Sequence, residues 1–211
     1  MAVFLTKSVF LHIPKCGGNW VKQVLKDNDL VRQEVLTDGH TRHESLEGRI
    51  ASGHNVPTHY GKFNKRSKER RVFTFVRHPL SWYASYWNWK SNAFKWTDSN
   101  EFDRKCKSSD FHEFIENVLD NYDGYLTEMY YTFTSHCGMI GKIESIGEDL
   151  KIILKHYNES FNYKTLGRLP ANTGRYKVKY TKSLADRIMD SEKLVVNRFG
   201  YNYLIDELVS I

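Results

Sequence analysis

The sequence is poor in cysteine and contains no long apolar run. Its three cysteines, Cys16, Cys106 and Cys137, are odd in number and far apart, which excludes a disulfide framework and a paired-cysteine zinc site. No apolar segment is long enough for a signal peptide or a membrane span, so we expect a cytoplasmic chain without a membrane span. An HExxH motif is also absent, and we expect no bound metal.

The chain also lacks internal repeats and low-complexity linkers that would divide it. We therefore expect a single domain over residues 1–211. Lysine and arginine number 31 against 25 aspartate and glutamate residues, which gives a net charge of +6 and favours an anionic ligand. The basic run at residues 65–71 has no interleaved aromatic residue, so we interpret it as a solvated face and expect no nucleic-acid partner.

The beginning of the chain predicts a strand, a glycine turn and a helix. Residues 8–13 contain a short apolar run that suits a buried strand. Pro14 has no N–H group to donate to a sheet, and Gly17 and Gly18 follow where the chain must turn sharply. Apolar residues within 20–25 then recur at the spacing of one helix face.

The N-terminus of this helix predicts an anion-binding site. Its backbone N–H groups and the positive end of its dipole point beyond the carboxyl end of the strand. Gly17 and Gly18 let the backbone approach a ligand there, and Lys15 adds a full positive charge. The spacing is neither GxxxxGK[ST] nor GxGxxG, because the lysine precedes the glycines. The alternative is an ordinary turn in which Lys15 is solvated.

A second strand and helix are predicted around Arg77. Residues 72–76 suit a buried strand. Pro79 suits the first turn of a helix, because an N–H group at that position would have no partner within the helix. A guanidinium group offers a planar pair of donors to phosphate, and Ser85, eight residues after Arg77, lies about two helical turns along the same side. The alternative is that Arg77 caps a sheet edge and that Ser85 binds no ligand.

These two motifs resemble those of sulfotransferases. Residues 12–18, HIPKCGG, are similar to the 5′-phosphosulfate loop of the glycan-modifying branch, and Trp20 is similar to a tryptophan of the cytosolic branch. Residues 77–85 resemble the family's 3′-phosphate motif. The resemblance implies a P-loop-like sulfotransferase fold, which is a three-layer α/β fold with a mostly parallel central sheet flanked by helices.

The resemblance also implies a reaction. It is the transfer of a sulfuryl group from 3′-phosphoadenosine 5′-phosphosulfate to a hydroxyl or an amine, with adenosine 3′,5′-bisphosphate as the product and without a metal. We expect a carbohydrate acceptor, although a small molecule is also possible, and the oligomeric state is open. Two other functions stay in consideration: a nucleotide-dependent phosphotransferase, and a non-catalytic module that binds anions, glycans or nucleic acid.

Site residues follow from the resemblance, position by position. Lys15 is expected to be catalytic, and Trp20 to stack on adenine. The residues expected at the nucleotide are Lys15, Cys16, Gly17, Gly18, Asn19, Trp20, Arg77, Ser85 and, by a looser match, Thr173, Gly174 and Arg175. Two positions depart from the family pattern, because Cys16 replaces a Thr or Ser, and Asn19 replaces a Thr that bonds the 5′-phosphate. For Cys16 we favour a packing role at a tight turn over a reactive thiol.

The general base is expected in the irregular loop at residues 51–63. Gly53 and His54 are similar to a segment that supplies the base in several glycan sulfotransferases. A neutral imidazole, with an ordinary pKa of about 6.5, accepts a proton near physiological pH. His54 is therefore the predicted base and His59 the reserve candidate, while a loop histidine that only caps backbone groups is the alternative.

Later segments predict further elements. The spacing that begins at Phe111 predicts an amphipathic helix, and residues 139–146 suit a strand. Residues 180–199 predict one helix with Ser183 as its N-cap and Leu194 directed inward. Aromatic residues are dense over residues 82–96, and we expect much of this segment in the core and the residues left over beside an acceptor groove.

Overall fold

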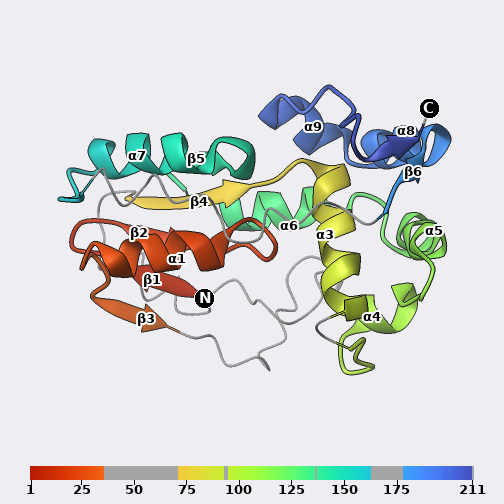
Figure 1. Cartoon of the computed structure of the whole chain (residues 1–211), viewed down its shortest axis with the longest axis horizontal. Helices are drawn as coiled ribbons and strands as arrows, with labels where there is room; N and C mark the ends of the chain where they lie inside the picture. The colour runs from red at the N-terminus through yellow and green to blue at the C-terminus, as the bar shows by residue number, and fades with distance from the viewer. Residues whose placement is uncertain (36–70, 93–94, 136, 163–177, 211) are drawn as a thin grey trace. The chain divides into compact units, whose positions relative to one another are not determined.

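The protein has two compact units, shown in the colours of chain order in Figure 1. The computed structural model describes residues 1–35, 71–92, 95–135, 137–162 and 178–210. Of these, the first unit contains residues 1–35, 71–77 and 131–162, without 136, and the second contains the remainder. That all 211 residues form one domain stays a prediction. Within the described ranges, no helix is both long and apolar enough to cross a membrane.

The first unit is built on a five-stranded sheet with the order β3-β1-β2-β4-β5. Its strands are β1 (Ala2–Phe4), β2 (Val9–Leu11), β3 (Gln33–Val35), β4 (Val72–Val76) and β5 (Met139–Lys142). β4 runs parallel to both β2 and β5, whereas β1 is antiparallel to β2 and to β3. The predicted α/β fold with a parallel core is thus confirmed, and the antiparallel edge makes the whole sheet mixed.

The central strands follow the apolar runs of the sequence. All five residues of β4 are buried, as the predicted strand at residues 72–76 requires. The Phe10 and Phe73 rings stack across β2 and β4 with centroids 5.4 Å apart. The Thr74 hydroxyl donates a hydrogen bond to the carbonyl oxygen of Leu11 at 2.7 Å, which ties the same two strands together.

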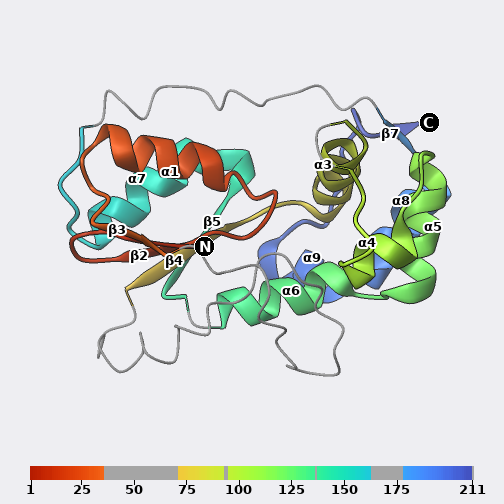
Figure 2. The same ribbon diagram turned by 90° about the horizontal axis from the view of Figure 1, so that it is seen from below.

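Helices cover the sheet. Figure 2 shows α1 (Gly18–Asp27) and α7 (Ile146–His156) on the same side of it. β5 is shorter than the predicted strand at residues 139–146, because the 3-10 turn η1 (Ile143–Ser145) intervenes before α7. The Asp149 carboxylate accepts from the Lys142 N–H at 2.7 Å and from the Ser145 hydroxyl at 2.9 Å, so it ends the strand and holds the turn.

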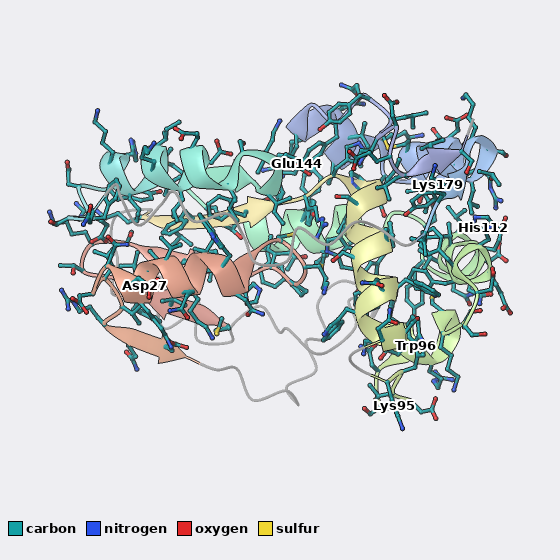
Figure 3. All side chains as sticks on the ribbon, viewed as in Figure 1. Asp27, Lys95, Trp96, His112, Glu144 and Lys179 are labelled. Carbon is teal, nitrogen blue, oxygen red and sulfur yellow. The ribbon has the colours of Figure 1, made fainter. Side chains whose placement is uncertain are left out.

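The second unit is mainly helical. Its elements are α3 (Pro79–Asn92), α4 (Glu101–Cys106), α5 (Phe111–Asn121), the first part of α6 (Tyr125–Thr134), β6 (Tyr180–Thr181), α8 (Lys182–Ser191), α9 (Lys193–Phe199) and β7 (Val209–Ser210). α5 confirms the amphipathic helix predicted from Phe111, and Asp110 caps it by accepting from the Glu113 N–H. Figure 3 shows His112 of α5 beside Lys179, whose carbonyl oxygen lies 2.7 Å from His112 Nε2.

Aromatic side chains make much of the second unit's core. Trp82, Tyr83 and Tyr86 of α3 are buried, as predicted for part of this aromatic segment, whereas Trp87, Trp89 and Trp96 are half-buried. The Trp82 and Tyr86 rings stack with centroids 5.1 Å apart. Trp96, labelled in Figure 3, contributes a ring 5.6 Å from that of Phe114. An acceptor groove lined by the remaining aromatic residues stays a prediction.

The C-terminal helix differs from its prediction. The chain breaks at Glu192 into α8 and α9, so residues 180–199 do not form one helix. The N-cap is Thr181, whose hydroxyl accepts from the Leu184 N–H at 3.2 Å, and the Ser183 prediction is wrong by two positions. Leu194 is 56% exposed, so its predicted inward position is also wrong. The break shifts the helical phase, and the buried residues of α9 are Val195 and Val196.

At the break, the Glu192 carboxylate is a buried acceptor. Its oxygens receive hydrogen bonds from the Tyr83 hydroxyl at 2.6 Å, the Leu126 N–H at 2.9 Å, and the Thr127 N–H and hydroxyl at 2.7 Å each. Burial raises the pKa of the Glu192 carboxyl, and the bonds from Tyr83 and Thr127 oppose that shift. The residue thereby joins the α8–α9 junction to the start of α6.

A second buried charge in this unit is Asp103. It forms an ion pair with Lys90, and only 6% of Lys90 is exposed. The Tyr86 hydroxyl donates to Asp103 Oδ1 at 2.7 Å, and the Thr97 N–H donates to Oδ2 at 3.2 Å. The pair fixes α3 against α4, because an ionised carboxylate in the interior needs a counter-charge and several donors.

Candidate active site

The candidate site lies where β2 and β4 end. These strands are parallel neighbours, so the residues that follow them lie at one edge of the sheet. β2 leads into residues 12–17 and then α1, and β4 leads into Arg77. Arg77 Nη1 donates a hydrogen bond to the carbonyl oxygen of Lys15 at 2.9 Å. The structure therefore brings together Lys15 and Arg77, which the sequence assigned to two separate phosphate-binding motifs.

The loop that carries Lys15 is a tight turn. The Cys16 N–H donates to the carbonyl oxygen of Ile13 at 3.3 Å, which places Pro14 and Lys15 at the two central positions. Lys15 has a φ of 63°, in the left-handed region. Proline followed by a left-handed residue is typical of a type II turn, where glycine or asparagine is the usual third residue. A lysine at this position adopts a conformation that L residues disfavour.

Both glycines of the loop are required by packing. Gly17 is the N-cap of α1 with a φ of 77°, and a Cβ atom there would lie 2.5 Å from Ile146 Cδ1. A Cβ atom on Gly18 would lie 1.8 Å from His12 Cδ2, so the imidazole occupies that space. Each contact explains the glycine without a ligand. That the glycines also allow a phosphate to approach stays a prediction.

His12 and Ile146 are site residues that the sequence reasoning missed. His12 belongs to the HIPKCGG segment, but that segment was interpreted through its lysine and glycines. Ile146 lies far along the chain, and a lone isoleucine gives no sequence signal of such a contact. Together they fill the space that a side chain at Gly17 or Gly18 would need.

The electrostatics of the loop favour an anion. Within the described ranges, no side chain caps the N-terminus of α1, and its first turn contains no acidic residue. The positive end of the helix dipole is therefore not offset by a local carboxylate. Burial, and after it the Arg77 charge, lower the pKa of the Lys15 ammonium to about 8, while Cys16 acts in the opposite direction. An anion next to Lys15 would oppose both effects and raise the pKa again.

The remaining predicted residues are placed as follows. Cys16 is buried with 1% of its surface exposed, which suits a packing role, whereas Asn19 is exposed and Trp20 half-buried near the start of α1. Ser85 is half-buried in α3 of the second unit. The predicted base and its reserve, and the late basic loop, lie outside the described residues; these are His54, His59, Thr173, Gly174 and Arg175.

His78, to which the sequence assigned no role, is fully buried in the second unit. Its Nδ1 accepts a hydrogen bond from the Leu80 N–H at 3.2 Å, and its Nε2 lies 2.8 Å from the carbonyl oxygen of Tyr203. Because a backbone N–H can only donate, the proton of the neutral ring lies on Nε2 and points to Tyr203. The residue fixes the start of α3 and acts in the fold.

The described part of the chain holds no group of three or more His, Cys, Asp or Glu side chains placed to bind a metal ion. A model of the sulfotransferase family matches residues 6–196. The chain belongs to the sulfotransferase family. Its enzymes use 3′-phosphoadenosine 5′-phosphosulfate as donor, so this sulfotransferase is an enzyme of that class. The match covers the Lys15 loop and Arg77. A search of curated proteins found no match, and neither did a search of solved structures.

Proposed function

We propose that this sulfotransferase transfers the sulfuryl group to a hydroxyl or amine of a carbohydrate, with Lys15 and His54 as its catalytic residues. The observation that carries the proposal is the contact between the Lys15 loop and Arg77 at the N-terminus of α1. A carbohydrate is favoured because HIPKCGG and the Gly53-His54 pair are similar to segments of glycan-modifying relatives.

The chemistry of the loop fits the donor molecule. The donor is a polyanion, and the site combines a helix N-terminus with the Lys15 side chain and with the Arg77 guanidinium, which bonds the Lys15 carbonyl. In the proposal, Lys15 and the N–H groups of residues 17–19 bind the 5′-phosphosulfate. Arg77, Ser85 and residues 173–175 bind the 3′-phosphate, and Trp20 stacks on the adenine.

Each catalytic residue has one task in the proposal. A new bond forms between the acceptor oxygen or nitrogen and sulfur, while the bond from sulfur to the bridging oxygen breaks. Lys15 and the loop N–H groups stabilise the negative charge that grows on the bridging oxygen, as preorganised donors do. His54 removes the acceptor's proton, and its support is the sequence pattern.

A thermal-unfolding comparison tests the donor assignment. Adenosine 3′,5′-bisphosphate at about a hundred times its dissociation constant should add about 2.7 kcal/mol to the free energy of unfolding. ATP with magnesium, at the same concentration, should add much less. The reverse order would contradict the proposal and would favour a phosphotransferase.

A transfer assay tests the acceptor. Incubation with 35S-labelled donor and a panel of glycans, phenols and tyrosyl peptides should label a glycan. The His54→Ala variant should bind adenosine 3′,5′-bisphosphate like the parent chain but should not transfer sulfate. If only His59→Ala is inactive, the base has been assigned to the wrong histidine.

A further inference from the structure

We propose that Arg77 positions the 5′-phosphosulfate loop by holding Lys15 in its left-handed conformation. This inference rests on the proposed function of Lys15, and it goes beyond the 3′-phosphate contact expected of Arg77. One side chain would then connect the two phosphate-binding motifs. Binding at one motif would depend on the same guanidinium group that shapes the other.

The first support is the conformation of the turn. Lys15, with a φ of 63°, occupies a backbone region that costs an L residue free energy, so the surroundings must hold it there. The turn's own hydrogen bond, from the Cys16 N–H to the Ile13 carbonyl, is 3.3 Å long. The bond from Arg77 to the Lys15 carbonyl is 2.9 Å long, and a charged donor makes it the stronger of the two.

The second support is the rigid attachment of Arg77 to the sheet. Arg77 follows directly on β4, whose residues are all buried. β4 is paired in parallel with β2 and with β5, and the Thr74 hydroxyl bonds the Leu11 carbonyl near the start of the loop. The backbone at Arg77 is therefore fixed by the sheet. A rigid support of this kind is what holds a functional group in a precise place.

The third support is compatibility with a ligand. A guanidinium group carries five N–H donors, so a bond to the Lys15 carbonyl and a contact with phosphate are compatible on one side chain. Arg77 and Lys15 repel each other electrostatically, and an anion beside them would relieve that repulsion. A bound nucleotide would thus strengthen the arrangement that Arg77 already holds.

Calorimetric titration with adenosine 5′-phosphate, which has no 3′-phosphate, tests the inference. If Arg77 shapes the Lys15 loop, Arg77→Ala should weaken this ligand by about tenfold to a hundredfold, as loss of a charged hydrogen bond does. It should weaken adenosine 3′,5′-bisphosphate by more, because the 3′-phosphate contact is lost as well. Arg32→Ala, which changes an exposed arginine of the same unit, should leave both affinities unchanged.

The outcomes distinguish failure of the Arg77 inference from failure of the proposed sulfotransferase function. Weaker binding of the bisphosphate together with unchanged binding of adenosine 5′-phosphate would overturn the inference and leave the sulfotransferase proposal intact. Failure of the parent chain to bind either nucleotide would overturn both.

A second measurement needs no nucleotide. An NMR titration of the Lys15 side chain should show a higher pKa in Arg77→Gln, because a repelling charge is removed. An unchanged titration would overturn the inference. Arg77→Met, which has no N–H donor, serves in the calorimetry if circular dichroism shows that Arg77→Ala is unfolded.

Discussion

The two units use charge in opposite ways. In the second unit, buried charges are matched within the fold: Lys90 pairs with Asp103, and Glu192 receives hydrogen bonds from α3 and α6. In the first unit, the loop after β2 brings two like charges together, and the Arg77 charge helps to lower the pKa of Lys15. A buried charge that lost its partner would destabilise the fold, whereas adjacent like charges raise its energy until an anion binds. The contrast supports the proposal that the first unit's loop binds the ligand.

The largest expected effect tests the role of Lys15 in the first unit's loop. Lys15→Met keeps the length of the side chain and removes its charge, so it should lower kcat by about 10²–10³-fold, as loss of one preorganised donor does. Nucleotide affinity should fall less. Lys26→Met, at the other end of α1, should retain activity. Equal kcat in parent and Lys15→Met would remove Lys15 from the mechanism.

The next largest effect tests how much the buried Glu192 network stabilises the second unit. Glu192→Ala removes the acceptor of hydrogen bonds from Tyr83, Leu126 and Thr127, so several buried donors lose their partner. We expect a loss of about 3 kcal/mol in the free energy of unfolding, measured by urea denaturation.

The control for Glu192 is Glu116→Ala. Glu116 lies on α5 and forms an exposed ion pair with Arg187, with an N···O distance of 2.7 Å. Exposed pairs of this kind contribute less than about 1 kcal/mol. Similar losses in the two variants would show that the Glu192 network contributes no more than a surface pair.

A smaller effect is expected at Gly18. The added methyl group of Gly18→Ala would collide with the His12 ring, so we expect a destabilisation of about 2 kcal/mol from overpacking. The double variant His12→Ala/Gly18→Ala should recover most of that loss, because the methyl group then has space. If the double variant is no more stable than Gly18→Ala, the His12 contact does not explain the glycine.

The smallest effect is a pH dependence of nucleotide binding. The pKa of Lys15 is about 8, so the ammonium loses its proton as the pH rises through that value. Affinity for adenosine 3′,5′-bisphosphate should therefore fall by about threefold to tenfold between about pH 7 and about pH 9. Binding should also take up protons, because the anion raises the pKa of Lys15. The dependence should be absent in Lys15→Met.

Local patterns were enough to predict the elements that form the candidate site. The apolar run at residues 72–76 and the sequence HIPKCGG predict β4, the turn and the helix, since each depends on neighbouring residues. The helix that begins at Phe111 was also predicted from the spacing of its own apolar residues.

Contacts between distant residues could not be predicted. The break at Glu192 depends on donors at Leu126 and Thr127, more than 60 positions earlier. The bond from Arg77 to Lys15 spans 62 positions, and neither residue type specifies the other. Helical periodicity alone therefore predicted one C-terminal helix and directed Leu194 inward.

The support of Gly17 by Ile146 has a consequence for synthesis of the protein. The loop emerges early from the ribosome, but Ile146 is translated 129 residues later (146 − 17). At about 5–20 residues per second, the nascent loop waits several seconds for its support. The packing of Ile146 against Gly17 is therefore completed only after α7 has emerged from the ribosome.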